Sequence, residues 1–280
     1  MSVDLILVHS GNIFPFYINS TIKLAKKYLF NIHIIIDQQF IDYIEDKSCV
    51  IVSCNSLEDS RYQTYNIKNY NSQFRDNFFS RTSSRFILLD NYISKNNIES
   101  CFHIENDIAM FSNLSKAQNI LENSQYDTAI VLDNATRCVP SIVWYRNKFS
   151  SNRLSSFIYN NNNIDDMRNL AIYFSRNREK VTNLPIVPFD LIDNHNGINY
   201  GNMYKNFNSI FDGAAIGQYL YGIDSLNGNS NTKGFINETC VFNASKYVYL
   251  ENSKPVFNYS NQKIIINNLH IHSKNFTELL

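Results

Sequence analysis

The chain has 280 residues, and its 25 Lys and Arg residues balance 25 Asp and Glu residues, which gives a formal net charge of zero. Hydrophobic residues make up 44% and charged residues 18% of the chain, which excludes a chain kept unfolded by excess charge. Neutrality also argues against a protein that coats nucleic acid, because neutralising many phosphates requires a basic surplus. The length allows one large domain or two small ones, with a hydrophobic core large enough to fold without disulfide bonds.

Five scattered cysteines, without a C-x-x-C pair, argue against a disulfide framework and against a zinc knuckle. They favour a reducing, cytoplasmic compartment. Residues 2–8 already have the pattern of a strand, so we expect no signal peptide, and the apolar runs are too short for a membrane span. The richness in Asn, Ile, Tyr and Phe is typical of an AT-rich genome, such as that of a giant virus or a bacterium.

The first part of the chain alternates between strand and helix. The predicted elements are a strand at 5–8, a helix at 18–29, a strand at 32–36 and a short strand at 50–52. This order is the opening of a parallel α/β sheet. The loop after the first strand of such a sheet is where ligands bind, so His9 and Asn12 are candidate ligand-binding residues.

The remaining elements follow in a less regular order. They are a long helix or a broken pair at 73–97, a strand that runs to a polar tip and back over 100–111, a helix near 115–123, strands at 127–132 and 141–145, and helices at 148–159 and 165–178. Prolines end the helical pattern at 184–188. A Gly- and Asn-rich stretch at 190–235 precedes short strands at 240–273. We find no internal repeat and no linker, so we expect one domain over 1–280.

The motif Glu105-Asn106-Asp107 ends an apolar strand. In an extended segment, residues i and i+2 point to the same side, so the carboxylates of Glu105 and Asp107 would project together. Such a pair can hold a hard divalent cation that bridges to a nucleotide phosphate. Acidic and amide residues are also common at turns without any function, and the motif by itself favours that interpretation.

Near the end of the chain, His270, His272 and Lys274 alternate and would share one face of a strand. Imidazole binds Mn²⁺-like or Zn²⁺ ions, and a nearby ammonium suits a phosphate. Half-exposed strand histidines are the alternative without function. A hydrolytic zinc site is the second functional interpretation, because many metal hydrolases use His-x-His.

Two arginines and two aspartates complete the candidates. Arg81 and Arg85 lie four residues apart and so on one helical face, where they would meet either phosphate or solvent. Asp166 lies at a predicted helix start, and Asp212 precedes a run of small residues. Each aspartate can serve simply as a helix cap.

The order of these motifs resembles that of glycosyltransferases with the A-type, nucleotide-sugar-binding fold, in particular the retaining group of glycogenin and the bacterial lipopolysaccharide galactosyltransferases. Glu105-Asn106-Asp107 is similar to their metal-binding D-x-D motif, with Glu in place of the first Asp. Arg85 precedes Glu105 at a separation similar to that of an arginine in those enzymes. Asp165-Asp166-Met167 resembles their Asp-Gln pair beside the donor sugar.

The C-terminal residues extend the resemblance, because those enzymes close the site with a metal-binding histidine and a lysine that meets the diphosphate. His272 is the preferred ligand over His270, because Ser273 and Lys274 beside it could reach a diphosphate with it. Lys274 follows His272 more closely than in the usual signature.

The resemblance implies a single Rossmann-like domain with a mixed central sheet flanked by helices. Residues 1–135 would hold the nucleotide sugar and the metal, and residues 136–280 would hold the acceptor and close the metal site. It implies transfer of a hexose or pentose from a nucleoside diphosphate sugar to a glycan, protein or other hydroxyl acceptor. Mn²⁺ or Mg²⁺ would neutralise the leaving diphosphate. No nucleic-acid partner is expected.

The same resemblance implies a role for each candidate residue. Glu105, Asp107 and either His272 or His270 would hold the metal. The nucleotide sugar would be bound by His9, Asn12, Arg81, Arg85 and Lys274. A carboxylate would stabilise the oxocarbenium-like transition state, with Asp166 as first candidate and Asp212 as second. In an inverting enzyme one of these two would instead be the base that deprotonates the acceptor.

Two other function classes stay open. One is a non-catalytic nucleotide-sugar or glycan-binding protein on the same fold, and the other is a metal-dependent hydrolase that uses His270 and His272. Metal-dependent hydrolysis of nucleotide sugars separates the three classes, because a transferase hydrolyses its donor slowly, a binding protein does not, and a zinc hydrolase ignores the nucleotide.

Overall fold

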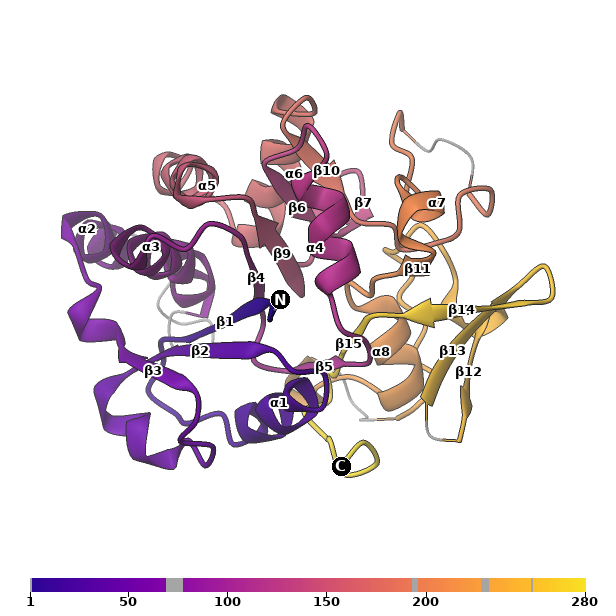
Figure 1. The fold of residues 1–280 in the computed structure, drawn as a ribbon, viewed down its shortest axis with the longest axis horizontal. Helices are drawn as coiled ribbons and strands as arrows, with labels where there is room; N and C mark the ends of the chain where they lie inside the picture. The colour runs from indigo at the N-terminus through magenta and orange to yellow at the C-terminus, as the bar shows by residue number, and fades with distance from the viewer. Residues whose placement is uncertain (1, 69–77, 193–195, 228–231, 253) are drawn as a thin grey trace.

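A seven-stranded mixed sheet forms the centre of the computed structural model (Figure 1), which describes residues 2–68, 78–192, 196–227, 232–252 and 254–280. The strand order is β10-β6-β9-β4-β1-β2-β3. The strands are β1 (Asp4–His9), β2 (Asn31–Ile36), β3 (Val50–Ser53), β4 (Cys101–Ile104), β6 (Thr128–Ile130), β9 (Ile142–Tyr145) and β10 (Val181–Asn183). Strands β4, β1, β2 and β3 run parallel, whereas β9 lies antiparallel between β4 and β6. The mixed α/β sheet predicted from the sequence is confirmed.

Helices lie around the central sheet and around the smaller C-terminal sheets (Figure 1). They are α1 (Tyr17–Lys26), α2 (Ser60–Lys68), α3 (Phe78–Asn96), α4 (Ser115–Glu122), α5 (Lys148–Asn160), α6 (Asp166–Arg176), α7 (Tyr204–Phe207) and α8 (Ala215–Tyr221), with short 3-10 turns at Gln38–Tyr43, Cys54–Ser56, Ser225–Asn227 and Ala244–Lys246. Helix α3 packs against α2 and α5. The start of the helix predicted over 73–97 lies outside the described residues. Within the described chain, no helix combines the length and apolar character needed to cross a bilayer.

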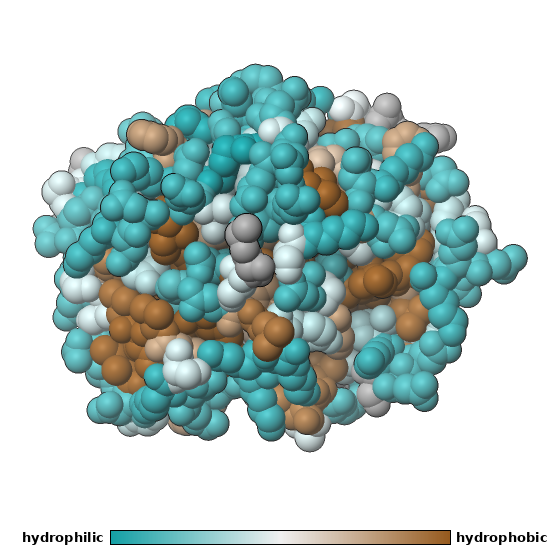
Figure 2. Space-filling view, in the orientation of Figure 1, coloured by the Kyte–Doolittle hydropathy of each residue, from teal (hydrophilic) through white to brown (hydrophobic). Residues whose placement is uncertain are grey.

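The central strands are buried on both faces, which explains their unbroken apolar runs. Leu5, Ile6 and Leu7 of β1 are fully buried, as are Ile34 and Ile35 of β2. Parallel strands covered by helices on both sides have this pattern instead of alternation. Figure 2 shows hydrophilic residues over most of one face of the molecule, with hydrophobic areas over β2 and β3 and beside β14.

Three smaller sheets complete the sheet structure of the described residues. They are β5 (Ile108–Met110) with β15 (Asn268–His270), the hairpin β7 (Leu132–Asn134) with β8 (Arg137–Cys138), and a four-stranded sheet of β11 (Ser209–Ile210), β14 (Gln262–Ile266), β13 (Lys254–Tyr259) and β12 (Val248–Glu251). Strand β15 ends at His270, so the prediction that His270 and His272 share one strand face is wrong. The chain turns there, because Lys274 N donates to Ile271 O at 2.8 Å.

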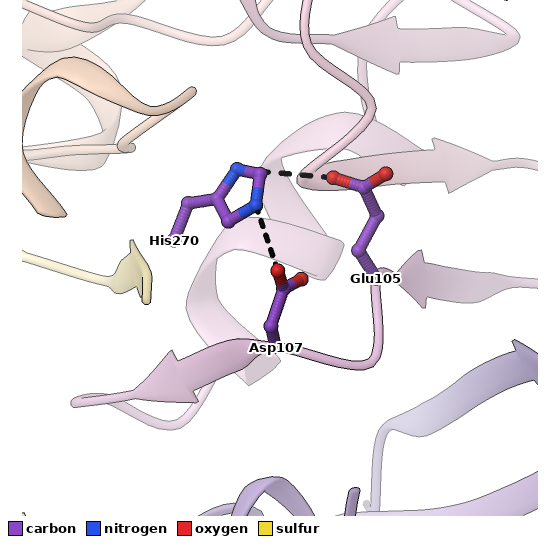
Figure 3. Close-up of side chains that lie close together, drawn as sticks. All are labelled: Glu105, Asp107 and His270. Atoms are coloured by element: carbon purple, nitrogen blue, oxygen red, sulfur yellow. Dashed lines mark hydrogen bonds and ion pairs between the residues drawn. The ribbon is translucent and has the colours of Figure 1, made fainter. Parts of the chain in front are cut away.

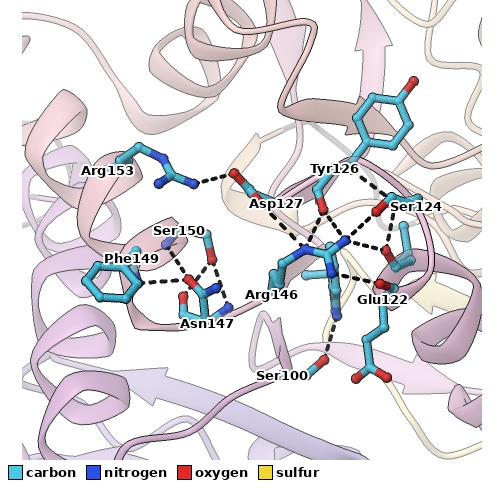
Figure 4. A network of polar contacts seen from close by, with 12 residues as sticks. Ser100, Glu122, Ser124, Tyr126, Asp127, Arg146, Asn147, Phe149, Ser150 and Arg153 are labelled. Atoms are coloured by element: carbon cyan, nitrogen blue, oxygen red, sulfur yellow. Dashed lines mark hydrogen bonds and ion pairs between the residues drawn. The ribbon is translucent and has the colours of Figure 1, made fainter.

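Arg146 joins the end of α4 to the central sheet (Figure 4). Its guanidinium donates to backbone carbonyls in the last turn of α4 and just after it, those of Leu121, Glu122, Ser124 and Tyr126, at 2.7–2.9 Å. Carbonyls at a helix C-terminus have no partner within the helix, and a cation there also interacts favourably with the negative end of the helix dipole.

Replacing Arg146 with Met is expected to lower the free energy of unfolding by about 3 kcal/mol, because several carbonyls lose their donor at once. Urea unfolding measures the loss. Arg153→Met is the matched control. The Arg153 side chain is half-exposed and lies 2.6 Å from Asp127 Oδ2, so its loss should lower the free energy of unfolding by less than about 1 kcal/mol. Equal losses of unfolding free energy in the two variants would argue against a stabilising role of the Arg146 hydrogen bonds to the end of α4.

Candidate functional site

The pairing of β15 with β5 builds a cluster of three ligand-type side chains at the end of β4 (Figure 3). Asp107 Oδ2 lies 3.0 Å from His270 Nε2, and Glu105 Oε2 lies 3.8 Å from His270 Nδ1. Ligand atoms of the three residues all lie within 4.8 Å of one another. Asp107 and His270 are buried, and Glu105 is nearly so. The polar tip predicted between residues 100 and 111 is therefore buried at Asp107.

The hydrogen bonds of His270 decide which ring nitrogen offers a lone pair. Nδ1 lies 3.0 Å from the carbonyl oxygen of Gly213, which can only accept, so Nδ1 carries the proton. In the neutral ring, Nε2 then carries a lone pair that points at the Asp107 carboxylate oxygen, which also carries lone pairs. A proton or a cation between the two atoms would make this contact favourable. Glu105 Oε2 is buried and accepts no hydrogen bond from the described residues.

These donor atoms fit a divalent cation. Two carboxylates and one imidazole bind a hard ion such as Mn²⁺ or Mg²⁺ better than they bind a soft ion. Adjacent ligands of an octahedral ion with bonds of about 2.1 Å lie about 3 Å apart, which the Asp107 and His270 atoms match. A backbone carbonyl that holds the other ring nitrogen is the usual support for a metal-binding histidine.

Arg85 ties this cluster to Asp166. Its Nη2 lies 2.9 Å from Glu105 Oε1 and 2.9 Å from Asp166 Oδ2, and all three side chains are largely buried. The alternative of a solvated helix face is therefore excluded for Arg85. Burial opposes ionisation of Glu105, yet Arg85, His270 and Lys274 lower its pKa to about 2.

The helix cap at the start of α6 is Asp165. Its Oδ1 accepts from Arg168 N at 2.8 Å, which leaves the Asp166 side chain to face Arg85. Burial raises the pKa of Asp166 to about 6, with Arg85 opposing the rise and Glu105 adding to it. The Asp166 carboxylate therefore pairs with Arg85, while Asp165 caps the helix.

Asp212, the second catalytic candidate, is buried and binds backbone N–H groups. Its carboxylate accepts from the backbone N–H groups of Ile216, Gly217 and His270 at 2.9–3.0 Å. A Cβ at Gly217 would lie 2.0 Å from the His270 carbonyl oxygen, so only glycine allows α8 to approach β15 this closely. Asp212 therefore positions His270.

His272 lies beside the cluster but outside it. Its Nδ1 accepts from Asp224 N at 2.9 Å, and its ring centroid is 5.6 Å from that of His270. Burial, and then the proximity of His270, lowers the pKa of His272 to about 4. The structure thus brings His270, and not the preferred His272, together with the two carboxylates. Lys274 Nζ contacts Asp107 Oδ2.

The nucleotide-binding candidates divide between two places. A cavity of about 280 Å³ lies at the carboxyl ends of β1 and β2, lined by Ser10, Gly11, Asn12, Asp37, Tyr62, Ser80 and Arg81. Arg85 and Lys274 lie at the acidic cluster instead. His9 Nε2 lies 2.9 Å from Ile13 O and so holds the loop.

Two acidic residues were not identified from the sequence. Asp37 directly follows β2, lines the cavity and accepts from Gly11 N at 2.8 Å. An acid at the end of the second strand is the signal that could have found it. Asp133 in β7 is 1% exposed, its Oδ2 accepts no hydrogen bond from the described residues, and it lies 3.6 Å from Arg137 Nη2. Its place at the end of a predicted strand was the signal there.

Asp133 should make stability fall as the pH rises. Burial raises its pKa from 3.8 to about 6, with Arg137 opposing the rise and Asp212 adding to it. The folded state favours the protonated acid, so its contribution is present below pH 4 and is lost as the pH passes 6. Ionising it at pH 8 costs about 3 kcal/mol.

Asp133→Asn removes this cost, since the amide is neutral at every pH. Urea unfolding should show the variant gaining about 1–1.5 kcal/mol on the parent between pH 5 and pH 8. Asp42→Asn, at an exposed position, is the control and should follow the parent. Parallel pH profiles for the parent and Asp133→Asn would contradict an ionised buried carboxylate.

No protein-family model and no curated protein sequence matches the chain. Mouse xyloside xylosyltransferase 1 in its apo form is structurally similar over 66% of this chain and 85% of its own, with 9% identity and a TM-score of 0.45. The galactosyltransferase LgtC, with donor and acceptor sugar analogues, is similar over 65% of this chain and 73% of its own, at 10% identity and a TM-score of 0.45. The glycosyltransferase GlyE of Streptococcus pneumoniae is similar over 66% of this chain and 45% of its own, at 10% identity and a TM-score of 0.42. At this level of similarity, the function has to be argued from the residues of the site.

Proposed function

We propose that the protein is a glycosyltransferase that moves a hexose or pentose from a nucleoside diphosphate sugar to a hydroxyl acceptor, with a divalent cation held by Glu105, Asp107 and His270. The observation that carries this proposal is the buried cluster itself, in which ligand atoms of the three residues lie within 4.8 Å of one another and Glu105 Oε2 accepts no hydrogen bond from the described residues. The cluster lies at the carboxyl end of the sheet, where α/β proteins bind ligands.

When bound, the cation would neutralise the charge that develops on the leaving diphosphate. The protein's own residues hold the groups around it. Arg85 keeps Glu105 and Asp166 in place through its two ion pairs. Asp166 offers its carboxylate where positive charge builds on the sugar ring in an oxocarbenium-like transition state.

The cavity at the ends of β1 and β2 is the proposed nucleoside site. Its volume of about 280 Å³ is near the lower end of the range for small-molecule pockets. Asp37 would accept hydrogen bonds from ribose hydroxyls or base N–H groups, and Arg81 would face a phosphate. Asn12 completes the polar lining.

A zinc hydrolase that uses His-x-His draws no support from this geometry, because His272 lies outside the cluster of Glu105, Asp107 and His270 within the described chain. A binding protein without turnover would share the whole site. Turnover is therefore the property that separates the proposal from its remaining alternative.

A thermal-shift screen of UDP- and GDP-sugars, with and without Mn²⁺, tests the proposal. We expect a nucleotide sugar to raise the melting temperature only when Mn²⁺ is present, and the same donor to be hydrolysed slowly. Stabilisation without any hydrolysis or transfer would favour the binding protein. Stabilisation by no nucleotide sugar under either condition would contradict the proposed function.

A further inference from the structure

Lys274 contacts Asp107 Oδ2, an oxygen that a cation at this site would need as a ligand. Its ammonium and His270 Nε2 both contact Oδ2 of Asp107. The Tyr17 ring centroid lies 5.4 Å from Lys274 Nζ, which gives the ammonium a second, weaker partner. The cluster therefore carries its own counter-ion when no metal is bound.

An ammonium and a divalent cation repel each other strongly at the distance of one shared carboxylate oxygen. Cation binding at Asp107 therefore requires Lys274 to withdraw. The structure allows this movement, because the Lys274 side chain is 30% exposed and belongs to the turn after β15, not to the paired strand. Its backbone has a φ of 62°, a left-handed conformation that a lysine does not favour.

We infer that Lys274 is an exchangeable counter-ion, which leaves Asp107 when a divalent cation binds and then pairs with the donor diphosphate, so that cation and donor bind with positive coupling. The inference rests on the proposed function. It adds that the state with both cation and diphosphate bound is favoured over the states with either ligand alone. A cation that binds alone displaces the ammonium without giving it a new partner. A diphosphate supplies that partner, so each ligand strengthens the other by the same factor.

Mn²⁺ binding to Lys274→Gln tests the inference without any measurement of turnover. Free Mn²⁺ is followed by electron paramagnetic resonance, without nucleotide and with UDP or GDP, after correction for Mn²⁺–nucleotide complexes in solution. Glutamine has a similar length and a similar cost at a positive φ, so the turn should persist. Lys233→Gln is the matched control, since it removes the same charge from an exposed ion pair with Glu278 on the same C-terminal segment.

In the absence of nucleotide, Lys274→Gln should bind Mn²⁺ on the order of tenfold more tightly than the parent, because nothing has to be displaced. The factor by which UDP or GDP tightens Mn²⁺ binding should at the same time shrink several-fold. Lys233→Gln should behave like the parent in both measurements.

Unchanged or weaker Mn²⁺ binding by Lys274→Gln alone would overturn the inference and leave the metal site standing. An equal nucleotide effect in parent and Lys274→Gln would overturn it as well, since Lys274 would then not pass to the diphosphate. Failure of the parent and both variants to bind Mn²⁺, with or without nucleotide, would overturn the proposed function and the inference with it.

Discussion

Replacing Asp107 with Asn is expected to abolish Mn²⁺-dependent binding of the donor and, with it, turnover. Asp107 supplies the charged oxygen nearest to His270 Nε2, and the amide would offer a neutral oxygen or a competing N–H group in its place. A hard divalent cation depends on the number of charged oxygen ligands, so we expect Mn²⁺ affinity to fall by a factor on the order of a hundred or more. Isothermal titration with Mn²⁺, and then with UDP or GDP, measures this loss.

A pair of histidine variants completes that test. His270→Gln should lose Mn²⁺ binding like Asp107→Asn, whereas His272→Gln should retain it within a few-fold, because His272 bonds to Asp224 N beside the cluster. Circular dichroism and thermal unfolding verify that each variant folds. Parent-like nucleotide affinity of Asp107→Asn in the presence of Mn²⁺ would remove the acidic motif from the site.

Replacing Asp166 with Asn should leave donor affinity near that of the parent and lower turnover by a factor on the order of a hundred or more. The amide is nearly isosteric and can still accept a hydrogen bond from Arg85, which keeps its bond to Glu105. Only the negative charge is lost, and that charge matters most when positive charge builds on the sugar ring. Steady-state kinetics with the donor identified in the screen separate the two effects.

The neighbouring cap provides the matched control for Asp166. Asp165→Asn makes the same chemical change one residue earlier, and Asn caps a helix as well as Asp does. We expect Asp165→Asn to retain parent-like turnover and stability. Parent-like turnover in Asp166→Asn as well would leave the proposed mechanism without its carboxylate.

The local pattern of the sequence determined the elements and the position of the acidic motif. The apolar runs at 5–8 and 34–36 predicted buried strands, which the structure confirms as β1 and β2. The spacing of Glu105 and Asp107 placed two carboxylates together at a strand end. Periodicity is a property of one element, so it can be read without knowing what that element packs against.

Tertiary structure alone decided which residues meet the motif. Asp107 and His270 are 163 residues apart, and Arg85 and Asp166 are 81 apart, so their contacts depend on the pairing of β5 with β15 and on the packing of α3 beside α6. The alternation of the two C-terminal histidines suggested one shared face, but the chain turns directly after His270. The faces of side chains follow from a local period only while the chain remains in one regular element, and this site lies where the strands end.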